Sequence, residues 1–181
     1  MNKNITYILI FLIFAGTALA NAAGHEQNRR VLPYESTFGH YEQMPIASGG
    51  DLRHYVTAHN PYKTRFKVWP GKGKIVEGTE PHGAFITVYV NNIAYKSITG
   101  KKVLENNSIV LKENYTPAKK LAAITIMYKV KSYNPEGGDW FWVKYDSDFQ
   151  ILKEGKVKGC LGCHGNVKDN DYIFTGKVTV K

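Results

Sequence analysis

Hydrophobic and polar positions alternate with a period of two over much of the chain after residue 60. The alternating runs are rich in β-branched and aromatic residues and are separated by turn sequences such as PGKGK, TPAKK and NPEGGD. Runs of this kind between turn residues are typical of antiparallel strands. The runs span residues 64–71, 84–92, 107–115, 122–133 and 139–146. The pattern predicts a mainly antiparallel sheet of about five strands in an α+β domain over residues 60–181.

The same pattern predicts a few helices packed on this sheet. Residues 91–100 (NNIAYKSITG) read as one short helix that ends at Gly100. Residues 23–59 lack the alternation and are predicted to be irregular to helical, with a short helix over roughly 50–58 that begins near Ser48 or Asp51.

Residues 1–22 have the pattern of a secretory signal peptide. A basic start (MNKN) precedes an apolar run and small residues that suit cleavage after Ala20 or Ala22. The apolar run is shorter than the roughly 20 residues of a membrane span, although a retained anchor is the alternative reading. We therefore expect an exported, periplasmic protein that is free of the membrane after cleavage.

The charge of the chain narrows the range of partners. Its net charge is +9, but the lysines are scattered in pairs and form no basic run or helix. This distribution argues against nucleic-acid binding in an exported protein. It favours a solvated basic surface that could steer anionic or redox partners.

The two cysteines of the chain lie in the late sequence CLGCH, as Cys160 and Cys163, directly before His164. C-x-x-C-H is the attachment signature of c-type haem. The two thiols form thioethers to one edge of the porphyrin, and the histidine is placed to ligate the iron. We therefore predict one covalently bound haem c near the C-terminus, with His164 as the proximal ligand.

The sequence gives less support to two other uses of a CxxC motif, a redox pair and a zinc site. A thioredoxin-like redox pair would usually sit in a βαβ context, which this sequence lacks. A zinc site would need further ligands, and His82 is the one other candidate with local sequence context.

The sequence offers no evident sixth ligand for the iron. Neither methionine nor histidine follows His164; Met127 lies in an apolar strand pattern, and Met44 is the other methionine of the mature chain. The N-terminal histidines read as surface residues, namely His25, His40, His54 and His59. The expectation is a five-coordinate iron with an open distal side.

Several residues are candidates for the walls of the haem pocket, and each has a plainer reading. Strand aromatics could cover the haem or could simply be sheet core: Phe85, Tyr89, Trp140, Phe141 and Trp142. Glu113 could accept protons from a bound substrate, or could be a solvated residue at a strand end. Arg65 could pair with haem propionates or orient an anion, or could be a surface arginine.

The sequences HGAFITVYVNNIA, LKENY, GDWFWVKY, CLGCH and DYIFT together resemble the cytochrome P-460 family, which includes the β-sheet cytochromes c′. The resemblance covers about residues 60–176. It implies a homodimer with an antiparallel sheet and a five-coordinate haem c. In P-460 enzymes it further implies a lysine cross-link to the haem, a distal glutamate, and oxidation of hydroxylamine with electrons leaving to an acceptor cytochrome. The β-type cytochromes c′ lack the cross-link, have an apolar distal pocket capped by phenylalanine, and bind nitric oxide or carbon monoxide.

The family roles transfer one residue at a time. Cys160, Cys163 and His164 match the haem motif, Glu113 matches the distal glutamate, and Arg65 is a weaker match for a distal arginine. Thr87 stands where the cross-linking lysine is expected; Lys67 and Lys96 flank its strand at other offsets, Phe85 would suit a capping residue, and Tyr89 lies on the same strand.

These matches lead to three functional hypotheses. The first is that the protein binds and oxidises hydroxylamine or nitric oxide. The second is a non-catalytic carrier or scavenger of nitric oxide. The third, an electron-transfer cytochrome, requires a sixth ligand.

Overall fold

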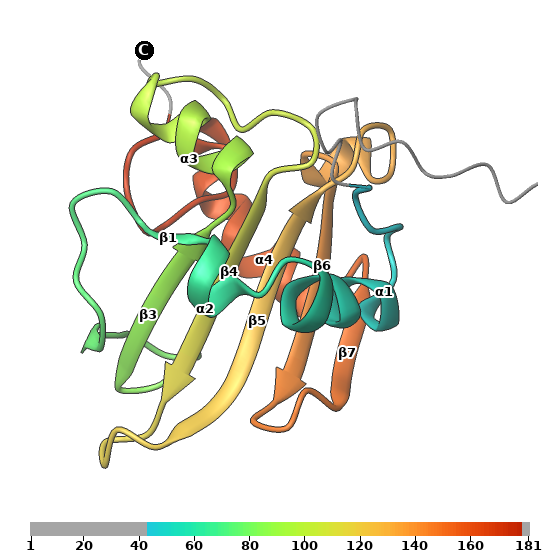
Figure 1. Cartoon of the computed structure of the whole chain (residues 1–181). Helices are drawn as coiled ribbons and strands as arrows, with labels where there is room; N and C mark the ends of the chain where they lie inside the picture. The colour runs from blue at the N-terminus through green and yellow to red at the C-terminus, as the bar shows by residue number, and fades with distance from the viewer. Residues whose placement is uncertain (1–42, 179–181) are drawn as a thin grey trace, which may run out of the picture. The chain divides into compact units, whose positions relative to one another are not determined.

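The structure is a computed structural model that describes residues 43–178 (Figure 1). The predicted signal peptide and residues 23–42 of the predicted N-terminal segment lie outside the described residues. None of the helices in the range 43–178 is long and apolar enough to cross a membrane.

A seven-stranded, fully antiparallel sheet forms the centre of the described chain. Its order is β1-β3-β4-β5-β6-β7, and β2 pairs with β3 beside β1. The strands are β1 (Lys67–Val68), β2 (Val76–Glu77), β3 (Phe85–Val90), β4 (Ile109–Tyr115), β5 (Leu121–Lys129), β6 (Trp140–Asp146) and β7 (Ile151–Gly155).

Helices precede the sheet, interrupt it and follow it. They are α1 (Gly49–His54), the π-helix η1 (Tyr55–His59), α2 (Tyr62–Arg65), α3 (Asn92–Thr99), the 3₁₀-helix η2 (Pro135–Gly137), α4 (Lys158–His164) and the 3₁₀-helix η3 (Gly165–Asn170). The Ser48 side chain caps α1 by accepting from Asp51 N, and the Asn91 side chain caps α3 by accepting from Ala94 N. Gly100 is the C-cap of α3.

The predicted α+β class is confirmed, and each of the five alternating runs contains a strand. The sheet has two strands more than expected. β2 has only two residues, too few for a periodic signal. β7 (ILKEG) is mostly exposed, so no alternation of apolar and polar residues marks it. The haem motif lies on α4, a short glycine-containing helix that the sequence pattern did not indicate.

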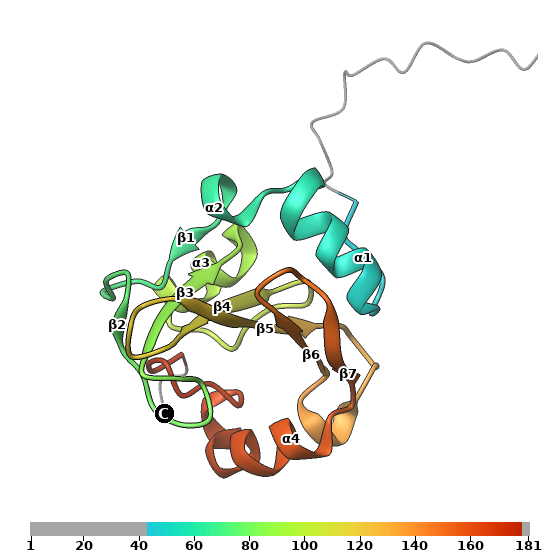
Figure 2. The same cartoon turned by 90° about the horizontal axis from the view of Figure 1, so that it is seen from below.

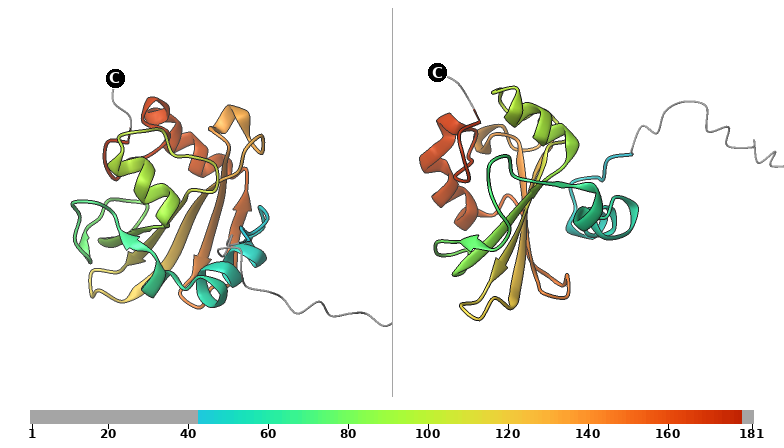
Figure 3. Two further views of the ribbon diagram at one scale, coloured as in Figure 1. Left: turned by 45° about the horizontal axis from the view of Figure 1, so that its top comes forward. Right: turned by 60° about the vertical axis from the view of Figure 1, so that its left-hand side comes forward.

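The two faces of the sheet are covered by different helices, as the view along the sheet shows (Figure 2). α1 and η1 pack on one face, here called the α1 face. α4 and the residues after it cover the other, here called the α4 face, and Ala94 and Ile98 of α3 belong to the core cluster of that face. The oblique views show the same separation of α1 from α4 by the sheet (Figure 3).

Alternation along the strands divides the core into two clusters. The α1-face cluster contains Leu52, Tyr55, Val56, Tyr62, Phe66, Tyr89, Ile109, Leu111, Ile124, Ile126, Tyr128, Phe141, Val143 and Tyr145. The α4-face cluster contains Trp69, Val88, Val90, Ala94, Ile98, Leu104, Val110, Met127, Trp140, Trp142, Ile173 and Val178. Because neighbouring strand residues belong to different clusters, a shift of one position moves a side chain to the opposite face.

Truncation of Leu111, which is fully buried in the α1-face cluster, should destabilise the fold strongly. Leu111→Ala is expected to lower the free energy of unfolding by about 2–5 kcal/mol, because it removes buried methyl groups and leaves a cavity. Val103→Ala is the control: Val103 is 53% exposed, and its truncation should cost less than about 0.5 kcal/mol. Equal effects of the two variants in urea unfolding would contradict this account of the core.

Candidate haem site

The residues of the haem motif are brought to the α4 face by α4. Cys160 is partly buried against the α4-face cluster, whereas Cys163 is exposed. Both are free cysteines. Their spacing of three residues puts the two thiols on neighbouring positions of one side of the helix, which suits attachment to one edge of a ring.

His164, at the end of α4, is buried and held in one orientation. Its Nδ1 lies 2.6 Å from the backbone oxygen of Tyr172, and because a carbonyl only accepts, Nδ1 is the donor. The ring lies against Trp142 (centroids 4.7 Å apart) and Phe174 (5.2 Å). Burial lowers the pKa of His164, so the imidazole is neutral and Nε2 is the nitrogen left for a metal.

Asp171 anchors the segment that orients His164. Its carboxylate accepts from Leu104 N at 3.0 Å and forms an ion pair with Lys129, and its backbone oxygen accepts from Trp140 Nε1 at 3.1 Å. These bonds tie the residue before Tyr172 to the sheet. The Tyr172 carbonyl is thereby held where it can fix the histidine tautomer.

Two cavities lie beside this motif on the α4 side. A cavity of about 340 Å³ is lined by the loop around His82, the ends of β4 and β5, Lys144 of β6 and Leu152 of β7. A second, of about 190 Å³, is lined by the loop before β3, by Ile86, Val88 and Lys112, and by Phe174.

The residues present on this face fit a haem. Trp142 Nε1 is buried beside His164 without a hydrogen-bond partner among the described residues, which is the condition expected where a bound group completes the site. Lys144 and Lys72 line the two cavities and carry charge complementary to haem propionates. Cys160 and Cys163 would hold the haem and His164 would ligate its iron; the group would supply a metal that coordinates small molecules.

Comparison with known families agrees with this fit. The sequence model of Cytochrome P460 matches residues 63–175, which is more than half of the chain. The chain belongs to the cytochrome P460 family. Membership of that family makes it a haem cytochrome and confirms the resemblance carried by its sequence motifs. No curated protein matches the chain.

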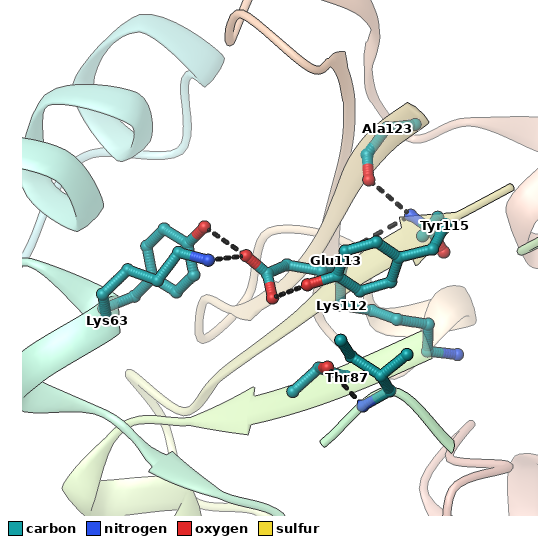
Figure 4. A network of polar contacts seen from close by, with 9 residues as sticks. Lys63, Thr87, Lys112, Glu113, Tyr115 and Ala123 are labelled. Atoms are coloured by element: carbon teal, nitrogen blue, oxygen red, sulfur yellow. Dashed lines mark hydrogen bonds and ion pairs between the residues drawn. The ribbon is translucent and has the colours of Figure 1, made fainter. Parts of the chain in front are cut away.

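Glu113 was predicted to be the distal proton acceptor. Its side chain lies on the α1 face of the sheet, whereas the haem motif lies on the α4 face. The carboxylate is fully buried and accepts from Tyr62 Oη at 2.7 Å and from Tyr115 Oη at 2.6 Å. It also forms an ion pair with Lys63 (Figure 4). Alternation in β4 explains the correction: Glu113 pairs in register with Thr87 and Ile124, whose side chains share its face.

Hydrogen bonding keeps the Glu113 carboxyl ionised. Burial alone would raise its pKa, but the hydrogen bonds from Lys63, Tyr115 and Tyr62 and the charge of Lys63 lower it overall. The same arrangement, together with burial, raises the pKa of Tyr62 and raises that of Tyr115 to about 12. The cluster is therefore a buried carboxylate surrounded by neutral phenols and one lysine.

The other predicted distal residues are likewise away from the haem motif, and none of them lines either cavity. Tyr89 packs in the α1-face cluster, with its ring 5.2 Å from that of Tyr62. Thr87 is buried and its hydroxyl accepts from Ile75 N at 2.9 Å. Phe85 lies under the Lys119 ammonium at 5.1 Å, and Arg65 is exposed at the end of α2. Because alternate strand positions share a face, Phe85, Thr87 and Tyr89 lie on the face opposite the haem motif.

The aromatic candidates divide in the same way. Trp140 and Trp142 belong to the α4-face cluster, whereas Phe141 belongs to the α1-face cluster. Met127 is buried core, as expected from its strand pattern. His54 and His59 are surface residues, also as expected, whereas His25 and His40 lie outside the described residues.

Two residues face the haem side although the sequence predicted no haem role for them: Lys112, and His82, which was considered only as a zinc ligand. Lys112 precedes Glu113, and its side chain points away from that of Glu113 (Figure 4); burial lowers the pKa of Lys112 to about 8. His82 is held by Asn114 on the same face, with Nδ1 3.2 Å from Asn114 Oδ1. Counting alternate positions back from Asn114 would have found Lys112, but only the tertiary fold brings in His82.

We expect Glu113 and its hydrogen-bond partners to contribute to the stability of the fold in a pH-dependent way. We expect them to contribute nothing to the chemistry of the haem. Folding lowers the pKa of Glu113 below its ordinary value of 4.5. The carboxylate therefore stabilises the fold above pH 4.5, and this contribution is lost as the pH falls toward the lowered pKa. Glu113→Gln should lower the free energy of unfolding by about 1–3 kcal/mol at pH 7 and flatten the acid limb of a stability–pH curve.

Glu105→Gln, at an exposed position, is the matched control and should leave that curve unchanged. The absorption spectrum and ligand affinity of the haem should be the same in wild type and Glu113→Gln. A change in the absorption spectrum or in the ligand affinity would show that Glu113 does act at the haem site.

Proposed function

We propose that this member of the P460 family is a haem c protein that binds nitric oxide reversibly, in the manner of the β-type cytochromes c′. The observation that carries the proposal is the position of Glu113 and Thr87. Both side chains lie on the α1 face, so neither the matched glutamate nor the position matched to the cross-linking lysine is directed at the haem motif.

The residues of the α4 face would have different roles in such a site. Cys160 and Cys163 hold the haem, and His164 ligates it with a tautomer set by Tyr172. Trp142 and Phe174 pack on the His164 ring, which is buried. The apolar α4-face cluster lowers the local polarity, which favours a neutral diatomic ligand over a charged one.

The cellular setting of this proposal follows from the sequence. Residues 1–22 would direct export to the periplasm, and the net charge of +9 would favour an anionic redox partner such as an acceptor cytochrome. The homodimer implied by the family resemblance stays a prediction.

Oxidation of hydroxylamine is the second candidate, and Lys112 is the observation in its favour. A partly buried amine whose pKa is lowered to about 8 is deprotonated above about pH 8 and can then accept a proton. Among the described residues its ammonium has no ion-pair or hydrogen-bond partner in the protein. Hydroxylamine would lose protons to such a base and electrons to an external acceptor.

Covalent haem and its ligands provide the first test. Denatured wild type should keep its haem through acid extraction, and Cys160→Ser/Cys163→Ser should lose it. The ferrous protein should show an ordinary haem c Soret band and bind nitric oxide without reducing a dye when hydroxylamine is added. A Soret band shifted far to the red, with dye reduction, would favour the enzymatic candidate.

Lys112→Met tests the second candidate directly. If Lys112 is the base, turnover of hydroxylamine should rise as the pH passes about 8, and the variant should lose at least about 100-fold in rate, the lower end of what a general base contributes. Lys131→Met, at an exposed position, is the control. Nitric oxide binding that survives in Lys112→Met would separate loss of a base from loss of the haem.

A further inference from the structure

The His82 and His164 rings lie next to each other on the α4 side of the sheet, in an edge-to-face arrangement. Their ring centroids are 6.1 Å apart and their planes are inclined at 86°. The two residues come from distant parts of the chain: His82 lies in the loop between β2 and β3, and His164 ends α4. Nothing in the haem motif requires a second histidine at this place.

Each of the two rings already uses its Nδ1. His164 donates from Nδ1 to the Tyr172 carbonyl, and His82 has Nδ1 against Asn114 Oδ1. The orientation of the Asn114 amide is set independently, because its Nδ2 donates to the carbonyl oxygens of Ala123 and Lys112. Asn114 Oδ1 is therefore an acceptor, His82 carries its proton on Nδ1, and Nε2 is the free nitrogen of both rings.

A second-sphere hydrogen bond of this kind is the usual arrangement for metal-ligating histidines. Because His82 Nδ1 is engaged by Asn114, a neutral His82 ring presents the lone pair of Nε2, as a ligand must.

The separation of the rings matches a shared metal. A metal held at about 2 Å from one nitrogen of each of two imidazoles keeps the ring centres roughly 6 Å apart. A free zinc ion would need about four ligands, and residues 43–178 contain no cluster of three or more His, Cys, Asp or Glu side chains that could hold a metal ion. Two axial nitrogens are enough for haem iron, because the porphyrin supplies the other four.

The loop that carries His82 is attached to the sheet. The His82 amide donates to Thr79 O at 2.9 Å, and Gly83 follows with φ of +88°. A Cβ at Gly83 would lie 2.6 Å from the backbone oxygen of Tyr115, so the loop approaches β4 more closely than another residue would allow. His82 also lines the larger cavity beside the haem motif.

From this geometry we infer that His82 is the second axial ligand of the haem iron. The inference rests on the proposed haem c function and refines it: at rest the iron is six-coordinate, and nitric oxide binds by displacing His82. This replaces the open, five-coordinate iron expected from the sequence, in which His82 was considered only as a zinc ligand.

Spectroscopy of the holoprotein tests the inference without any assay of turnover. Wild type without added ligand should be low-spin and six-coordinate in both the ferric and ferrous states. His82→Ala should become high-spin and five-coordinate, and added imidazole should restore the low-spin spectrum. Its apparent affinity for carbon monoxide should rise at least about tenfold, because a blocked position reduces apparent affinity by the fraction of open protein.

His54→Ala, at an exposed position on α1, is the matched control and should keep the wild-type spectrum. His82→Met keeps a ligating side chain if the alanine variant folds poorly, and it should stay low-spin with a raised reduction potential.

Failure of the inference is distinct from failure of the proposed function. Covalently bound haem with a high-spin, five-coordinate spectrum in wild type would overturn the role of His82 and leave the haem c function standing. A low-spin spectrum that persists in His82→Ala, and is lost in Lys112→Met, would also overturn it by assigning the position to Lys112. Absence of covalently bound haem would instead remove the proposed function itself.

Discussion

Alternation of side chains in a sheet covered on both faces is the constraint on which the rest of this structure depends. β4 shows its effect most clearly, because Lys112 and Glu113 are neighbours in the chain and lie on opposite faces. Burial alone would disfavour the charge of either residue. On the α1 face three hydrogen-bond donors keep Glu113 ionised, whereas burial without an ion pair lowers the pKa of Lys112 on the α4 face.

The two faces consequently serve different purposes. The α1 face is closed by α1 and η1 and satisfies its one buried carboxylate with Tyr62, Tyr115 and Lys63. The α4 face retains two cavities, an unpartnered indole nitrogen and a free nitrogen on His164. An unpartnered buried indole nitrogen beside open cavities is typical of a site that awaits a ligand rather than of a structural core.

The segments that orient the site come from far apart in the chain. Asp171 ties the C-terminal segment to the loop after α3 through Leu104, to β5 through Lys129 and to β6 through Trp140. Asn114, in β4, orients His82 from the loop before β3. The proximal and distal sides of the proposed haem site are thus both built on the same sheet, so that their separation is set by β-pairing rather than by α4 alone.

Local sequence determined the strands, the capped helices α1 and α3, and the identity of the haem-attachment residues, because periodicity, caps and the C-x-x-C-H spacing are short-range signals. Tertiary structure decided which residues meet the haem motif. The match of the motif KENY to the family suggested Glu113 as the distal glutamate, but the face of each strand position depends on pairing register and on which helix covers that face. The place of His82 depends on a loop closing over β4, a contact between positions more than thirty residues apart that no local pattern encodes.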